Sequence, residues 1–314
     1  MARALIAIVG ETATGKTAVG EVVARAIGGE VVCADARQVF RELEIGTGRP
    51  TPDERAAIPH HLFDRWGLGE AVTAGAWARA AAAVCDDAFA RGATPVLVGG
   101  SGLYLEALRV GLHPEPPRDP ALRAALVAEA EAVGIEALHA RLATLDPTTA
   151  AALAPRDRQR VLRALEVVTV GGHPLAWWRS RPREVPLVAQ WVTHRLTCTP
   201  EVLATRIAAR TAAMWEAGLL EETQALVREG KGPALHRLAA IGYDEALAVL
   251  EGGSSPTDAM ARMNERTRQM AKRQRTWFRH HAPGDTHVAD AADAGEAIAR
   301  LIVTAHGTAG RGSG

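Results

Sequence analysis

The sequence predicts an α/β fold of the P-loop NTPase type: a mostly parallel sheet with helices on both faces, plus an all-helical insert domain. Three observations support this prediction. A phosphate-loop motif follows the first apolar run, short apolar runs alternate with helical patterns, and one proline-bounded stretch contains helical patterns only.

The motif GETATGKT occupies residues 10–17 and fits G-x-x-x-x-G-K-[ST]. The apolar run Ala4–Val9 before it predicts a buried strand, and AVGEVVARAIG after it has helical spacing. In such a loop backbone N–H groups surround phosphates, Lys16 reaches the terminal oxygens and the Thr17 hydroxyl reaches Mg²⁺. The alternative is a glycine turn between a strand and a helix, but the complete motif in this context favours a phosphate site.

Further apolar runs predict strands at residues 30–36, 60–64, 94–100 and 191–198. A long alanine-rich helix is expected after Thr73, which is a suitable N-cap. Alternating strands and helices indicate a parallel sheet covered on both faces. Right-handed crossovers then bring the loops that follow the strands to one edge, where ligands bind.

The alternation ends at GLHPEPPRDP, residues 111–120. From there to about residue 186 only helices are expected, beginning near Asp119, Ile135 and Asp157. We therefore expect a helical insert at 113–187 between two parts of the α/β core, 1–112 and 188–314. The final segment, GTAGRGSG, is expected to be flexible.

Composition limits the classes of function. The 36 basic and 36 acidic residues among 314 cancel, so RNA binding would require local concentrations of basic residues. Three isolated cysteines argue for a reducing compartment and against structural zinc. No signal peptide and no apolar run of ~18 residues are present, so a cytoplasmic protein without membrane association is expected.

Asp35 follows the second predicted strand, a position that faces the crevice beside the phosphate loop. A carboxylate there could bind Mg²⁺ through water or act as a general base, and the alternative is a helix N-cap. No strand ends in a clear Walker B aspartate, because HHLFD, which ends at Asp64, is short and begins with two histidines. A phosphate loop without that aspartate suggests that the bound phosphates are a leaving group.

Basic residues are concentrated in two stretches. Seven arginines lie between Arg156 and Arg183, and seven basic residues lie between Arg262 and Arg279. In the second stretch one helical stripe is expected, formed by Arg268, Lys272, Arg275 and Arg279. Such stripes suit phosphate backbones, and Trp177, Trp178 and Trp277 could stack on unpaired bases; the alternative is a solvated helix face with core tryptophans.

Two smaller clusters allow more than one interpretation. Arg206 and Arg210, four residues apart on a predicted helix, could close over the phosphates or form a surface pair. The histidines of HHAPGDTH, His280, His281 and His287, are expected in a Pro/Gly loop and are a weak metal candidate.

Taken in order, the motifs resemble the tRNA dimethylallyltransferases over nearly the whole chain. The resemblance is carried by GETATGKT, ADARQVFRELEIGTGRP, IPHHLFD, LVGGSGLYLEAL, DRQRVLRALEV, AAIGYDEAL and MAKRQRTWFR. It implies transfer of a dimethylallyl group from its diphosphate to the exocyclic amine of the adenine 3′ of the anticodon. It also implies Mg²⁺ as cofactor, and tRNA and dimethylallyl diphosphate as partners of a monomeric enzyme. The chain lacks cysteines for the zinc finger of some eukaryotic relatives, so the bacterial form is expected.

The resemblance also implies residue roles. It makes Asp35 the general base, with Thr14 and Arg206 as further catalytic residues, and puts Mg²⁺ on Thr17. The residues expected to bind the diphosphate are Gly10, Glu11, Thr12, Ala13, Thr14, Gly15, Lys16 and Thr17. Those expected to contact the tRNA anticodon stem-loop are Asp35, Ala36, Arg37, Gln38, Ser101, Arg123, Gln159, Arg160, Val161, Leu162 and Arg163. Among these, Gln38 is expected to read base edges. The helical insert is expected to clamp the anticodon stem.

The chain departs from the family pattern at several positions. Thr14 replaces Ser and Ser101 replaces Thr, so both keep a hydroxyl, while Phe40 replaces Tyr. Glu11 replaces Pro and adds a negative charge beside the phosphate loop. We expect this side chain to point outward.

Three alternatives stay open from sequence. A P-loop small-molecule kinase would bind ATP in the loop, but the missing Walker B aspartate and the arginine-rich stretches argue against it. An adenylate-type isopentenyltransferase would use the same donor with a free nucleotide as acceptor, whereas the helical insert favours tRNA. A non-catalytic RNA-binding nucleotide switch would not depend on Asp35.

Overall fold

The computed structural model of the chain describes residues 3–281 and 286–290. The tail predicted to be flexible, 307–314, lies outside these residues. The chain forms two compact units, Met1–Arg109 with Pro186–Gly314, and Val110–Val185. The sequence-based boundaries of the helical insert were 113 and 187.

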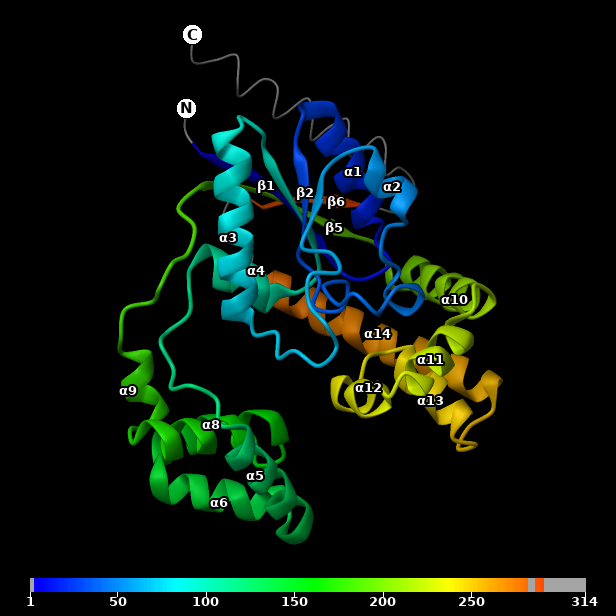
Figure 1. The fold of residues 1–314 in the computed structure, drawn as a ribbon. Coiled ribbons are helices and arrows are strands. Elements are labelled where there is room, and N and C mark those ends of the chain that lie inside the picture. Colours follow the sequence, from blue (N-terminus) through cyan, green and yellow to red (C-terminus); the bar gives the residue numbers. More distant parts are fainter. Residues whose placement is uncertain (1–2, 282–285, 291–314) are drawn as a thin grey trace. The chain divides into compact units, whose positions relative to one another are not determined.

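The larger unit contains a parallel six-stranded sheet in the order β3-β2-β4-β1-β5-β6 (Figure 1). Its strands are β1 (Ala4–Gly10), β2 (Glu30–Cys33), β3 (His60–His61), β4 (Pro95–Gly99), β5 (Gln190–Thr197) and β6 (Thr286–Asp290). Each pair of sheet neighbours that is not consecutive in sequence requires a crossover, as expected for alternating strands and helices.

One strand prediction and one loop prediction need correction. The third strand ends at His61 rather than continuing to Asp64, because Leu62 and Asp64 have φ of 64° and 47° and leave the extended conformation. The histidine-containing segment predicted as a Pro/Gly loop instead contains regular structure. His280 and His281 form the end of α14, and His287 lies in β6.

Helices cover both faces of the sheet. Helix α1 (Lys16–Ile27) packs on the face that carries Val98, where a Cβ on Gly20 would come within 2.4 Å of that side chain. On the opposite face, Ala7 and Val9 of β1 share a small cavity with side chains of α4 (Gly102–Arg109) and α14 (Pro256–His281). Helix α3 (Ala74–Ala90) packs against α4. The predicted cap at Thr73 is confirmed, since its hydroxyl accepts the Ala76 N–H at 3.1 Å.

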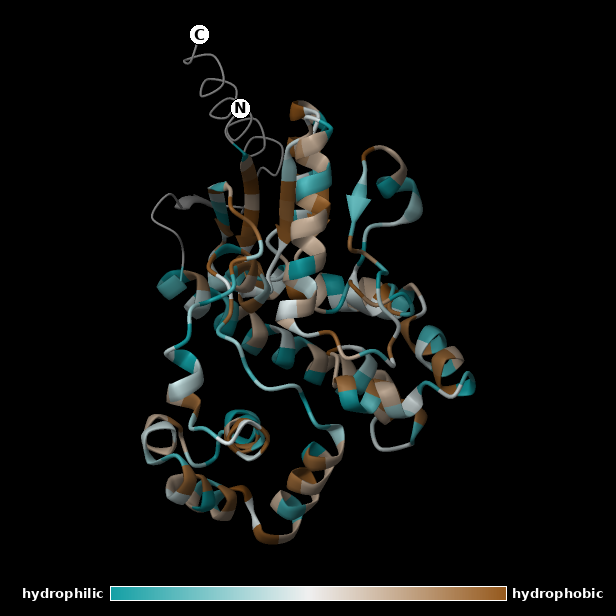
Figure 2. Ribbon diagram, turned by 60° about the vertical axis from the view of Figure 1, so that its left-hand side comes forward, coloured by the Kyte–Doolittle hydropathy of each residue, from teal (hydrophilic) through white to brown (hydrophobic). Residues whose placement is uncertain are grey.

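The remaining helices of this unit follow β2 and β5. They are η1 (Ile45–Thr47), α2 (Pro52–Ala56), α10 (Pro200–Glu216), α11 (Leu219–Arg228), α12 (Gly232–Leu238) and α13 (Tyr243–Leu250). Figure 2 shows apolar residues concentrated along the central strands. Within residues 3–281 and 286–290, no helix is both long and apolar enough to cross a membrane.

The smaller unit consists of five helices: α5 (Pro120–Val133), α6 (Ile135–Leu145), α7 (Pro147–Ala152), α8 (Arg158–Gly171) and α9 (Leu175–Arg179). Asp119, Asp146 and Asp157 cap α5, α7 and α8 by accepting N–H groups of the first turn. Its core is separate and includes Leu126, Leu138, Leu142, Val161 and Leu165. The first and last segments of the unit pair with each other, since the Glu184 N–H donates to the Leu112 carbonyl at 3.1 Å.

Candidate active site

The phosphate loop connects β1 to α1. Gly10 has a φ of 141°, and a Cβ there would lie 2.2 Å from the Leu196 carbonyl oxygen, so the position requires glycine. Ala13 and Gly15 have φ of 63° and 85°, and α1 begins at Lys16. The first amides of α1 have no partner within the helix and favour an anion at this end.

The loop opens onto a cavity of about 1250 Å³. The loops after β1, β2 and β4 gather there because these three strands are adjacent and parallel. Of the sequence-predicted residues the cavity brings together Thr12, Ala13, Thr14, Gly15, Lys16, Thr17, Asp35, Ala36, Arg37, Gln38, Ser101 and Arg206. Gly10 and Glu11, predicted with the loop, do not line it.

Lys16 lies inside the cavity wall. Its ammonium donates to the Glu11 carbonyl at 2.5 Å, and the Thr14 hydroxyl donates to the same oxygen at 2.8 Å. Burial lowers the pKa of Lys16 to about 8, while the negative charge of Asp35 acts in the opposite direction. The site therefore combines a buried cation, Lys16, with a carboxylate, Asp35, that interacts with it electrostatically.

Asp35 follows β2, and no helix begins there. Its Oδ1 accepts the N–H of Arg37 at 2.8 Å and that of Gln38 at 3.4 Å, so the alternative of a helix N-cap is wrong, but the carboxylate does stabilise a turn. Ser101 supports the same turn, because its hydroxyl accepts the Ala36 N–H at 2.9 Å. One carboxylate oxygen is thus fixed by backbone amides, which orients the other.

The side chains beside Asp35 contact neighbouring segments. The Gln38 amide nitrogen donates to the carbonyls of Thr47 at 3.2 Å and Gly48 at 3.0 Å and so stabilises the segment at the end of η1. That Gln38 reads base edges stays a prediction. Arg37 donates to the Leu238 carbonyl at 3.2 Å, and burial lowers its pKa.

Helix α10 contributes two arginines to the cavity, Arg206 and Arg210. Arg210 donates to the Thr12 hydroxyl at 3.2 Å and to the Thr47 carbonyl at 2.8 Å, which links the phosphate loop to the end of η1. Burial lowers its pKa, and attraction to Asp35 opposes that shift. The spacing of four residues on one helix indicates both arginines as candidates for phosphate binding. Of the two, only Arg206 is among the predicted site residues, so Arg210 is an addition from the structure.

The expectation that Glu11 points outward is wrong. The side chain has an exposed fraction of 1%, and Oε1 accepts a hydrogen bond from Arg275 Nε at 2.6 Å. The basic stripe of α14 is accordingly not a free row of cations. Arg275 is paired with Glu11, and Arg268 forms an ion pair with Glu265 at 2.7 Å.

In the helical unit, the predicted RNA-contacting residues have different environments. Gln159 and Arg160 are exposed at the start of α8, whereas Val161 and Leu162 have exposed fractions of 0% and 1%. The side chains of Val161 and Leu162 belong to the hydrophobic core and are not exposed to an RNA, so their contact with tRNA stays a prediction. Two further predicted residues, Arg123 and Arg163, both form ion pairs with Glu166, at 2.8 and 2.9 Å.

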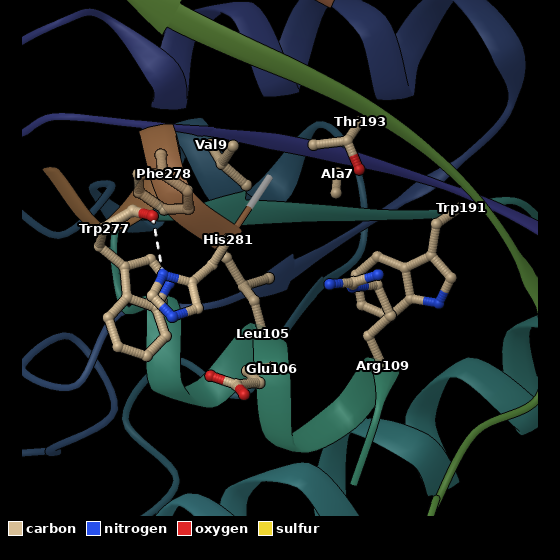
Figure 3. A pocket seen from close by; sticks show the side chains of 11 residues that line it. Ala7, Val9, Leu105, Glu106, Arg109, Trp191, Thr193, Trp277, Phe278 and His281 are labelled. Carbon is tan, nitrogen blue, oxygen red and sulfur yellow. Dashed lines mark hydrogen bonds between the residues drawn. The ribbon is translucent and has the colours of Figure 1, made fainter. Parts of the chain in front are cut away.

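The tryptophans predicted to stack on bases have partners of their own. Trp177 stacks on His173 with ring centroids 4.0 Å apart, and Trp277 stacks on His281 at 4.2 Å. Trp277 and His281 border the small cavity on the α4 and α14 face of the sheet, which is lined mainly by apolar side chains (Figure 3). Apart from Trp277 and His281, that cavity contains none of the sequence-predicted candidates, so the candidate site is the larger cavity at the phosphate loop.

Magnesium is compatible with the donors of this larger cavity. Thr17 and Asp35, both of which line it, supply the hydroxyl and carboxylate oxygens that Mg²⁺ prefers beside phosphate. Within the described ranges, 3–281 and 286–290, no cluster of three or more His, Cys, Asp or Glu residues could hold a metal. A magnesium ion here would therefore depend on the bound phosphates for much of its coordination.

Comparison with known proteins shows the family of this chain. A family model described as IPP transferase matches residues 38–281, which leaves the phosphate loop and Asp35 outside the matched range. Among similar proteins is the "tRNA dimethylallyltransferase" of Syntrophobacter fumaroxidans, which is 40% identical over 95% of this chain and 86% of that protein. The protein of the same name from Anaeromyxobacter sp. is 44% identical over 88% of this chain and 91% of that protein.

Solved structures agree with these relatives. The chain resembles the full-length tRNA isopentenylpyrophosphate transferase of Bacillus halodurans with a TM-score of 0.67 and 32% identity, over 96% of each chain. It also resembles a eukaryotic dimethylallyltransferase acting on tRNA with a TM-score of 0.81 and 26% identity, over 98% of this chain and 80% of that one. The chain therefore belongs to the IPP transferase family.

Proposed function

We propose that this protein transfers a dimethylallyl group from dimethylallyl diphosphate to the exocyclic amine of the adenine 3′ of the anticodon in tRNA and releases diphosphate. The observation that carries this proposal is the shared cavity of the phosphate loop and Asp35. The relatives named tRNA dimethylallyltransferase, at about 40% identity over most of both chains, support the same reaction.

The cavity supplies the two groups that prenyl transfer requires. In the reaction the bond between the allylic carbon and a diphosphate oxygen breaks, and a bond between that carbon and the adenine amine forms. Lys16 and the amides at the start of α1 stabilise the negative charge that develops on the leaving diphosphate. Asp35 accepts the proton that the amine loses, with its orientation fixed by the amides of Arg37 and Gln38.

Thr17 would bind Mg²⁺ together with the diphosphate oxygens, and the ion would neutralise part of the charge on the leaving group. Arg206 and Arg210 add positive charge from α10 on the cavity wall. A magnesium titration of the reaction in metal-free buffer tests the requirement for the ion.

The adenine must leave its stack to reach this cavity, at a cost of about a few kcal/mol. We propose that the exposed start of α8, Gln159 and Arg160, contributes contacts that offset this cost. The proposal limits the RNA contacts of α8 to its exposed residues, because Val161 and Leu162 are buried.

The test is to incubate the protein with unmodified tRNA, Mg²⁺ and dimethylallyl diphosphate and to weigh the tRNA nucleosides by mass spectrometry. Wild type should form prenylated adenosine, and Asp35→Asn should lower the rate by about 10²-fold or more through loss of the base. Asp87→Asn, which changes a carboxylate that pairs with Arg91 on α3, serves as the matched control.

The other outcomes identify the rival reactions. Prenylation of free AMP but not of tRNA would assign the protein to the nucleotide-acceptor class. Consumption of ATP without prenylation of either acceptor would instead indicate a kinase.

A further inference from the structure

Glu11 is an acidic residue inside the phosphate-loop motif, and it is almost completely buried. Its Oε1 lies 2.6 Å from Arg275 Nε, and its Oε2 is buried without a hydrogen-bond partner. An unneutralised carboxylate here would repel a diphosphate, since charges interact strongly in a buried environment. Arg275 of α14 supplies the compensating charge.

The backbone of Glu11 determines where two other loop side chains lie. Its carbonyl oxygen accepts the Thr14 hydroxyl at 2.8 Å and the Lys16 ammonium at 2.5 Å. Anchoring the Glu11 side chain therefore also restricts the carbonyl to which Lys16 is bonded.

The residue before Arg275 makes a second link between α14 and the loop. Gln274 Oε1 accepts the Thr12 N–H at 2.8 Å, and its Nε2 donates to the Gly100 carbonyl at 3.1 Å. Arg275 also donates to the Cys198 carbonyl at 3.2 Å. Two consecutive residues of α14 thus tie the loop after β1 to the segments that follow β4 and β5.

We propose that Gln274, Arg275 and Glu11 are positioning residues of the diphosphate site: α14 fixes the phosphate loop, and Arg275 neutralises the Glu11 carboxylate so that the loop can bind an anion. The proposal builds on the proposed function, which requires diphosphate in this loop. It differs from the sequence-based expectation, in which Arg275 belonged to a stripe for RNA phosphates.

Binding of inorganic pyrophosphate, measured by calorimetry without tRNA, tests the proposal independently of prenyl transfer. Arg275→Gln should weaken pyrophosphate binding by about tenfold or more, because it leaves the Glu11 charge buried and uncompensated. The double variant Glu11→Gln/Arg275→Gln should recover most of the loss, because no uncompensated charge remains.

Arg268→Gln is the matched control, since it removes an arginine of the same helix whose partner, Glu265, lies on that helix and is exposed. Its pyrophosphate affinity should equal that of wild type. In the enzymatic reaction, Arg275→Gln should raise the KM for dimethylallyl diphosphate and leave the KM for tRNA unchanged.

Two results would overturn the proposal. In one, Arg275→Gln lowers the melting temperature but binds pyrophosphate as wild type does, which would make the ion pair structural only. In the other, the variant loses tRNA affinity and retains pyrophosphate affinity, which would indicate that Arg275 contacts RNA instead of supporting the diphosphate site. If pyrophosphate binding behaves as expected but no prenyl transfer is found, the positioning role stands and the proposed function fails.

Discussion

Lys16 illustrates how burial tunes a single residue of the site. Its ammonium is bonded to the Glu11 carbonyl, and burial lowers its pKa to about 8. A diphosphate that reaches Lys16 would replace this single neutral acceptor with charged oxygens, so the bound anion would raise the pKa again.

This shift predicts that diphosphate affinity depends on pH. The anion binds the protonated lysine, so loss of this proton should lower the affinity by up to tenfold per unit above about pH 8. Calorimetric titration with pyrophosphate from about pH 7 to about pH 10 measures the profile. Lys16→Arg, whose guanidinium stays protonated, should lose this decline. A wild-type profile without any decline would show that Lys16 does not bind the anion as a cation.

At the scale of elements, the segment after Glu44 depends on contacts from α11 and α13. The Glu222 carboxylate accepts the N–H groups of Glu44 at 2.8 Å and Ile45 at 3.1 Å. Tyr243 donates to the same carboxylate at 3.0 Å and accepts the Gly46 N–H at 3.2 Å. A Cβ on Gly46 would come within 2.4 Å of the Tyr243 ring, so this close packing requires glycine. The segment positioned in this way forms one wall of the cavity.

Removing the Tyr243 hydroxyl should therefore destabilise the larger unit. Tyr243→Phe leaves the Gly46 N–H without its acceptor and removes one of the donors to the Glu222 carboxylate, so the free energy of unfolding should fall by about 1–3 kcal/mol. Urea unfolding measures it. The matched control is Tyr104→Phe, because the Tyr104 hydroxyl makes no hydrogen bond with the described part of the chain while its ring stacks on Trp77. Equal losses in both variants would contradict the assigned role.

Helix α8 presents two different faces within five consecutive residues. Leu162 packs in the core of the helical unit, and Gln159 is exposed. Leu162→Ala should lower the free energy of unfolding by about 2–5 kcal/mol through loss of burial and a residual cavity. Gln159→Ala should change it by less than about 0.5 kcal/mol and instead weaken tRNA binding. Thermal unfolding and tRNA titration of both variants distinguish the two roles; reduced tRNA affinity of a fully stable Leu162→Ala protein would contradict this assignment.

At the scale of the whole molecule, the chain divides its chemistry between two compact units. Every residue that lines the large cavity belongs to the unit that contains the sheet. The helical unit has its own core, and its two ends meet at Leu112 and Glu184. Because the helical unit is one continuous segment, Val110–Val185, a single replacement can remove it from the chain.

We predict that donor binding survives removal of the helical unit and that tRNA modification does not. Replacement of residues 110–185 by a short Gly-Ser linker should leave pyrophosphate affinity within about threefold of wild type. Prenylation of tRNA should fall by at least about 10²-fold if the unit supplies the phosphate contacts that favour the flipped adenine. Full activity of the shortened chain on tRNA would contradict this division.

Local patterns in the sequence were sufficient for much of this protein. Apolar runs indicated β1, β2, β4 and β5, the motif located the phosphate loop, and Thr73, Asp119 and Asp157 marked helix starts, because strand burial and helix capping depend on nearby residues. The order of the motifs also predicted the family. The third strand was predicted too long, because the chain leaves the extended conformation after His61, and β6 was not predicted, because it depends on pairing with β5.

Only the tertiary structure decided which charges of the site are available. Glu11 and Arg275 are separated by 264 positions, and nothing in the spacing of either segment indicates that they meet. The same holds for Arg210, whose partners Thr12 and Thr47 come from two distant loops. Periodicity reports the face of a helix on which a side chain lies, whereas the packing of helices against the sheet determines which opposite charge it meets and how far both are removed from water.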